Sequence, residues 1–105
     1  MEIVFKKEYL RELYKTGKTT DKKHRFQPQV AEKYRKTIDI LESVTSVEGL
    51  FVYNGLQYEK LHGDKEGLES VRVNDQYRIE FTTSQVVSET VVTVCDIEEL
   101  SNHYK

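Results

Sequence analysis

The 105-residue chain has 32% charged and 37% hydrophobic residues, which suits one small globular domain covering residues 1–105. Its aromatic content of 10% and its periodic apolar positions exclude a disordered chain. No apolar run approaches the roughly 18 residues of a membrane span, and residues 1–6 lack the pattern of a signal peptide. Because Cys95 is the single cysteine, no internal disulfide can form, and we expect a cytoplasmic protein.

The charged residues are unevenly distributed, although the net charge is only −2. Residues 1–25 hold eight Lys or Arg and four Asp or Glu, whereas the remaining 80 residues hold eight and fourteen. This basic excess has two interpretations: a solvated helix face with its loop, or a surface that contacts a phosphate backbone. Under the second interpretation, the contacting side chains include Lys22, Lys23 and Arg25.

The N-terminal half predicts a strand over Glu2–Phe5 and two helices. The first helix begins near Lys7, and Gly17 is a plausible stop after its last turn. Residues 18–26 read as a polar loop, and Pro28 fits the first turn of the second helix. The apolar positions of both helices recur at spacings of three and four residues: Tyr9, Leu10, Leu13 and Tyr14 in the first, and Val30, Ala31, Tyr34, Ile38, Leu41 and Val44 in the second.

Beyond Gly49 the apolar period changes from 3.6 to 2, which is typical of strands. The predicted strands are residues 57–62, 68–73, 77–81 and 89–97, with turns at residues 74–76 and at Ser84-Gln85. The order of elements predicts an α+β fold in which two N-terminal helices pack on one face of an antiparallel β-sheet meander. We expect Val71, Val73, Tyr77, Ile79 and Phe81 to be buried against Leu13, Tyr34, Ile38 and Leu41, and the opposite face to stay open.

The turn at residues 74–76 would place Arg72 directly opposite Arg78 on the open face. Two like charges so close are unfavourable without an anion between or near them, which makes this pair a feature to note. Alternatively, both side chains extend into solvent or form salt bridges with Glu69 or Glu80.

Residues 58–81 read Tyr-Glu-Lys-Leu-His-Gly-Asp-Lys-Glu-Gly-Leu-Glu-Ser-Val-Arg-Val-Asn-Asp-Gln-Tyr-Arg-Ile-Glu-Phe. This segment resembles the signature of HigB-type toxins of the RelE/ParE superfamily. The positions that match at fixed spacing are Gly63-Asp64, Gly67, Ser70, Arg72-Val73-Asn74 and Tyr77-Arg78. The N-terminal helices and the C-terminal residues are similar too, so the likeness spans nearly the whole chain.

The resemblance implies a RelE-like α+β fold and a toxin of a type II toxin–antitoxin system that cuts ribosome-bound mRNA without a metal or other cofactor. In that chemistry a ribose 2′-hydroxyl attacks the adjacent phosphorus, and the reaction needs a base, an acid and cations. Arg78 matches the family arginine that stabilises charge, and Arg72 lies beside it. His103 and Tyr104 resemble the histidine and tyrosine of the family's C-terminal tail, although their order and spacing differ.

The sequence departs from the family pattern at two positions. His62 stands where a lysine is usual, and Glu59 where a histidine is often found. The resemblance leaves His62 as a candidate base, with Lys60 as a substitute cation, although a lone histidine on a strand is otherwise a surface or structural residue. Lys65, in a basic position of the pattern, joins the loop residues expected to contact RNA or the ribosome. His24 is expected to be merely solvated.

The resemblance also implies a partner, a helix-turn-helix antitoxin of the HigA type, so that any link to DNA would be indirect. Two other function classes remain open. One is a ParE-like or inactive toxin-fold protein that acts by protein binding without RNA cleavage, and the other is a structural partner domain. A nuclease requires Arg72, Arg78, His62 and His103 to converge on one pocket, whereas a binding protein needs only a complementary surface. No residue set has metal-ligand spacing.

Overall fold

The computed structural model describes residues 1–102, and its N-terminal part contains β1 (Glu2–Phe5), α1 (Glu8–Thr16) and α2 (Pro28–Ser43). Gly17 follows α1 in a left-handed conformation (φ 78°), and its N–H donates to the carbonyl oxygen four residues earlier. Only glycine adopts this conformation without steric cost, so it ends the helix. A proline occupies the first turn of α2. The predicted strand, both helices and the glycine stop are confirmed.

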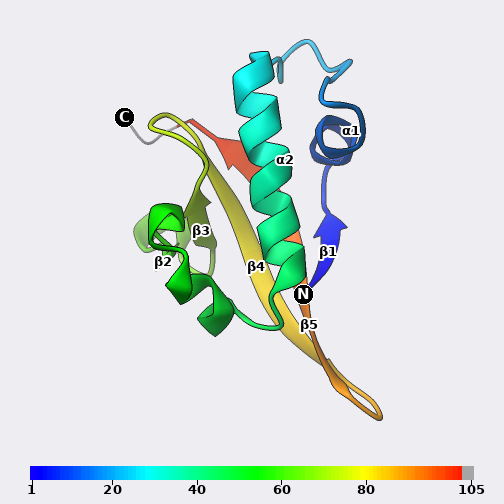
Figure 1. Cartoon of the computed structure of the whole chain (residues 1–105), viewed down its shortest axis with the longest axis vertical. Coiled ribbons are helices and arrows are strands. Elements are labelled where there is room, and N and C mark those ends of the chain that lie inside the picture. Colours follow the sequence, from blue (N-terminus) through cyan, green and yellow to red (C-terminus); the bar gives the residue numbers. More distant parts are fainter. Residues whose placement is uncertain (103–105) are drawn as a thin grey trace.

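Five strands form one sheet in the order β1-β5-β4-β3-β2 (Figure 1). The other four are β2 (Glu59–Lys60), β3 (Glu69–Arg72), β4 (Arg78–Val87) and β5 (Val91–Ser101). They pair as the predicted antiparallel meander. β1 instead pairs in parallel with β5, because the two helices that follow it carry the chain across to the far side of the sheet. The α+β fold is confirmed, with one parallel strand added to the meander.

Two strand boundaries differ from the prediction. The turn predicted at Ser84-Gln85 is wrong, because β4 continues through these residues and pairs with β5 as far as Val87 opposite Val91. The strand predicted over residues 57–62 is reduced to the two residues of β2. Short 3₁₀ segments at Val47–Val52, Asn54–Leu56 and Gly63–Lys65 take up most of the surrounding chain. Cross-strand pairing, which local composition does not encode, decides both boundaries.

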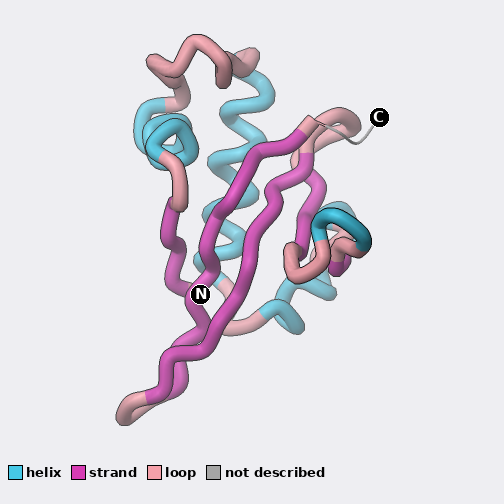
Figure 2. The backbone as a smooth tube through the Cα atoms, turned by 180° about the vertical axis from the view of Figure 1, so that it is seen from behind, coloured by secondary structure: helices cyan, strands magenta, loops and turns pink. Residues whose placement is uncertain are grey.

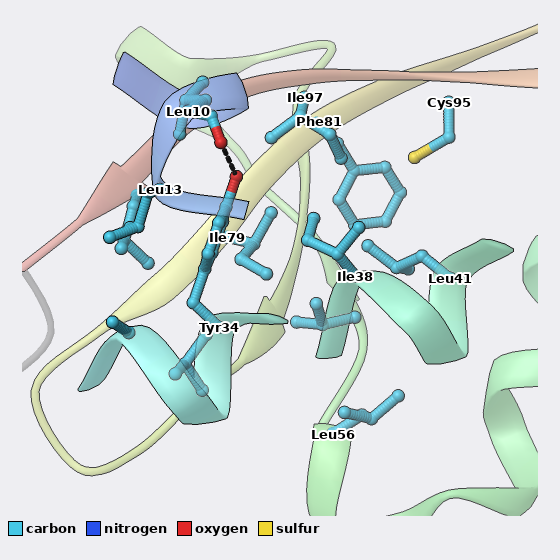
Figure 3. Close-up of a cluster of buried hydrophobic side chains, with 14 of the residues drawn as sticks. Leu10, Leu13, Tyr34, Ile38, Leu41, Leu56, Ile79, Phe81, Cys95 and Ile97 are labelled. Atoms are coloured by element: carbon cyan, nitrogen blue, oxygen red, sulfur yellow. Dashed lines mark hydrogen bonds between the residues drawn. The ribbon is translucent and has the colours of Figure 1, made fainter. Parts of the chain in front are cut away.

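The core lies between α2, α1 and one face of the sheet (Figure 3). The Tyr34 hydroxyl donates to the carbonyl oxygen of Leu10 at 2.8 Å, which joins the two helices inside the core. Tyr77 is only half-buried and packs against the rim of the core. The rest of the predicted core is confirmed as buried: Leu13, Tyr34, Ile38, Leu41, Val71, Val73, Ile79 and Phe81.

The sheet has one face covered by α2 and a second face on the opposite side, called the back face below (Figures 1 and 2). Val71 pairs with Ile79 in the core, so the alternating residues Arg72, Arg78 and Ser70 lie on the back face. The prediction that the back face stays open is wrong. Ser70, Arg78 and Glu80 are buried there by one another and by adjacent segments. Among the described residues, no helix is long and apolar enough to cross a membrane.

Candidate functional site

Arg78, at the first position of β4, forms the centre of the back-face site. Its Nε donates to Ser70 Oγ at 2.9 Å, its Nη2 donates to the carbonyl oxygen of Gln57, and Nη2 lies 3.7 Å from Glu59 Oε1. The residue is 7% exposed. The expectation that it faces solvent is therefore wrong, because the segment leading into β2 folds over it. These contacts hold the guanidinium in one orientation.

A second cation lies on the same face. Lys65, in the 3₁₀ segment Gly63–Lys65, forms an ion pair with Glu80, which follows Arg78 by two residues and so shares its side of β4. The Lys65 side chain is one-third exposed, whereas that of Glu80 is almost fully buried. Each buried charge on this face thus has a partner of opposite sign, as charges removed from water require.

Arg72 pairs with Arg78 across β3 and β4, in the register predicted from the three-residue turn. Its guanidinium forms an ion pair with Asp75 in that turn. The turn is held by Asn74, whose Oδ1 accepts from two backbone N–H groups at 2.8 and 2.9 Å. The alternative of a salt bridge to Glu69 is wrong, because that carboxylate lies on the other face.

A cleft of about 360 Å³ opens between the loop that joins the two helices and the end of β5. Lys23 and Arg25 line it and are exposed, and Lys22 beside them is exposed as well. The cleft also includes Tyr77, Ser101 and Asn102. The structure thus places two of the three predicted RNA-contacting loop residues beside the C-terminal end of the sheet.

His24 lies in this cleft and is more constrained than a solvated loop residue. Its ring stacks on Tyr9 with centroids 3.8 Å apart, and its Nδ1 lies 2.8 Å from Asp21 Oδ2. The prediction of a merely solvated side chain is therefore wrong. The contact with Asp21 could have been predicted from the Asp-x-x-His spacing, because residues three apart in a turn can contact each other. The stacking on Tyr9 of α1 is a tertiary contact that this spacing does not indicate.

Ser101 connects the cleft with Arg78. It lines the cleft and also pairs with Arg78 across β4 and β5, so Arg72, Arg78 and Ser101 form one row across the back face. Ser101 is 4% exposed. Among the described residues, its Oγ is a buried side-chain oxygen without a hydrogen-bond partner. A buried hydroxyl in this state calls for an explanation, and a ligand that accepts or donates a hydrogen bond supplies one.

Lys60 and His62 lie in a different cleft, of about 380 Å³, with Glu69, Tyr58 and Thr83. Glu69 is buried and accepts from the hydroxyls of Tyr58 (2.5 Å) and Thr83 (2.8 Å). Burial and the bond to this carboxylate raise the pKa of Tyr58, which keeps its hydroxyl a donor.

His62 is highly exposed, and its Nδ1 lies 3.6 Å from Glu66 Oε2. Arg78 does not line this cleft, so the predicted convergence of His62 with Arg78 is not seen. His103 and Tyr104 lie outside the described residues. Within residues 1–102, no group of three or more His, Cys, Asp or Glu is placed to hold a metal ion.

Comparisons with known proteins identify the relatives of this chain. The family model described as RelE-like toxin of type II toxin-antitoxin system HigB matches residues 3–95. Toxin HigB-1 of Vibrio cholerae serotype O1 is 35% identical over 83 residues, which cover 77% of this chain and 82% of that protein. The structure of a YoeB/ParE toxin from Agrobacterium tumefaciens superposes with a TM-score of 0.57 over 99% of this chain and 100% of that one. Its identity of 20% supports the fold alone.

Proposed function

This chain belongs to the HigB-like family of RelE-like toxins from type II toxin–antitoxin systems, and we propose that it is a ribosome-dependent endoribonuclease that cleaves mRNA. In this reaction a ribose 2′-hydroxyl attacks the adjacent phosphorus and the 5′-oxygen departs. Negative charge grows on the phosphoryl oxygens in the transition state, so a fixed cation beside them lowers the barrier.

The observation that carries the proposal is the arrangement around Arg78. Ser70 and Gln57 already fix its guanidinium, so little orientational freedom is lost when a phosphate binds. The Glu59 carboxylate that faces it is half exposed and lies 3.7 Å from Nη2. A phosphate oxygen can displace such a weak ion pair, and the Ser101 hydroxyl is the adjacent donor in the same row.

The proton transfers are assigned from the sequence. His103 and Tyr104 follow Ser101 by two and three residues, and we propose them as the first candidates for base and acid. His62 and Lys60 line a separate cleft, so they stand second. Lys22, Lys23, Arg25 and Lys65 contact the phosphates of mRNA or the ribosome in this proposal.

The proposed setting follows from the same family. The toxin acts in the cytoplasm on ribosome-bound mRNA and is neutralised by a helix-turn-helix antitoxin of the HigA type, which would provide its only link to DNA. Induced expression without antitoxin should arrest bacterial growth and leave mRNA cut within translated regions. Growth arrest with intact mRNA and damaged DNA would instead support a ParE-like activity.

Ser101→Ala and Arg78→Lys test the site through cleavage of a defined mRNA on purified ribosomes. Removing a hydroxyl without a partner leaves no group unsatisfied, so Ser101→Ala should keep the melting temperature while cleavage falls about ten-fold. Arg78→Lys keeps the charge but loses the planar fork, and cleavage should fall roughly 10²- to 10³-fold. If both folded variants cut at the wild-type rate, the back-face row is not the site.

A further inference from the structure

The hairpin formed by the ends of β4 and β5 projects past the end of α2 (Figure 1). Its residues continue the sheet face that α2 covers further up: Thr83 pairs with Cys95, Gln85 with Thr93, and Val87 with Val91. Since α2 ends at Ser43, the outer pairs of this face have no helix above them. Val87 is 69% exposed and Val91 60%.

A cleft of about 360 Å³ lies over the inner part of the same face, at Thr83, Gln85 and Thr93, two residues short of the exposed valines. It lies between the chain that follows α2, at Val47 and Glu48, and the strand residues Gln85 and Thr93. We call the surface made by Val47, Glu48, Gln85, Val87, Val91 and Thr93 the hairpin surface. Valine side chains at the end of an exposed hairpin are an aggregation hazard unless a partner covers them.

The backbone of β4 is available along the same surface. β3 pairs with β4 only as far as Phe81, opposite Glu69. Within the described part of the chain, no strand lies beside the outer edge of β4 over residues 82–87. An unpaired edge of this length can accept an extended peptide through main-chain hydrogen bonds.

The chain segments that form the hairpin surface carry acidic residues and no basic ones, although Lys60 lines the neighbouring cleft with Val47 and Thr83. Residues 37–58 and 79–102 contain no Lys or Arg, and they include Glu42, Glu48 and Glu89, which are exposed. The exposed lysines and arginine of the interhelical loop belong to the other end of the fold. A ligand that binds the hairpin surface therefore gains from positive charge.

We propose that the hairpin surface binds the antitoxin, through an extended segment that carries apolar side chains and Lys or Arg. The apolar side chains cover Val87 and Val91, the backbone pairs with the outer edge of β4, and the basic side chains approach Glu48. RNA is disfavoured here because its phosphates would meet acidic residues. A second copy of this chain is disfavoured because its own hairpin is equally acidic.

This location has a consequence for how the toxin is neutralised. The hairpin surface shares no residue with the back-face row or with the basic cleft. An antitoxin held there leaves the proposed site uncovered by that contact. The proposal rests on the family's pairing with an antitoxin and not on RNA cleavage, so the two can fail separately.

The affinity of the purified cognate antitoxin for hairpin variants tests the proposal. Burying one valine is worth about ten-fold in affinity, so Val87→Asp with Val91→Asp should weaken binding roughly 100-fold or more. Glu48→Lys should weaken it several-fold and reduce its dependence on salt. Val52→Asp, at a 79% exposed valine outside the hairpin surface, is the matched control and should bind as the wild type does. Melting curves establish that each variant is folded.

Amide hydrogen exchange of the wild-type complex gives a second, mutation-free measurement. Binding of the antitoxin should slow exchange along the outer edge of β4 within residues 82–87. Unchanged affinity in the folded Val87→Asp, Val91→Asp variant, or unchanged exchange at this edge, would overturn the proposal. Loss of self-association with intact antitoxin binding would do so as well, because it would assign the surface to a second copy.

Discussion

At the residue scale, the back face of this small sheet buries charged side chains that the sequence analysis expected to be exposed to solvent. Arg78 and Glu80 are both buried, and each takes part in an ion pair with a more exposed residue, Glu59 or Lys65. An Arg78→Ala change would leave the Gln57 carbonyl and Glu59 without this partner. Some loss of stability is therefore expected with any loss of activity, which is why the more conservative Arg78→Lys is the better test.

Cys95 gives a prediction at the same scale. Burial, followed by the nearby Glu69 carboxylate, raises the pKa of its thiol to about 12 from the usual value of 9.0. Since the thiolate is the reactive form, labelling by a disulfide reagent at pH 8 should be about 1000-fold slower in the native protein than in urea. Because the thiol ionises more readily in the unfolded chain, this group also lowers native stability as the pH rises from about 9 to 12. Rapid labelling of the native protein would contradict the buried placement.

At the scale of elements, α1 depends on its C-terminal glycine. A Cβ at Gly17 would be strained by the φ of 78° and would lie 3.4 Å from Arg35 Nη1. Gly17→Ala should therefore destabilise the protein by about 1 kcal/mol. Gly55→Ala is the matched control, because it has no positive φ and open space around its Cβ position, and should change stability by less than about 0.5 kcal/mol. Urea denaturation measures both, and equal effects would refute the role of the left-handed conformation.

At the scale of the whole molecule, opposite charges occupy opposite ends. The exposed loop residues Lys22, Lys23 and Arg25 lie beside the end of β5, while the β4–β5 hairpin, whose tip carries Glu89, projects from the other end. This polarity suits a protein that contacts RNA with one end and a basic protein segment with the other.

The basic end predicts a salt-dependent contact with the ribosome. Replacing Lys22, Lys23 and Arg25 by alanine should weaken ribosome binding and lower the slope of log K against log salt by about 0.7–0.9 for each lost phosphate contact. Replacing Lys33 and Lys36, exposed on α2, should leave the slope unchanged. Antitoxin affinity should not change in either variant. An unaltered slope in the loop variant would show that these residues are merely solvated and do not contact phosphates.

The sequence by itself determined both helices, the glycine stop, the meander and the pairing of Arg72 with Arg78. These features depend on periodicity and turn chemistry, which act between residues close in the chain. The tertiary structure decided the parallel placement of β1, the length of the β4–β5 hairpin and the burial of Arg78. It also brought Ser101 beside Arg78 and stacked His24 on Tyr9. Each of these depends on pairing or packing between elements, and no local sequence pattern records the free energy of those contacts.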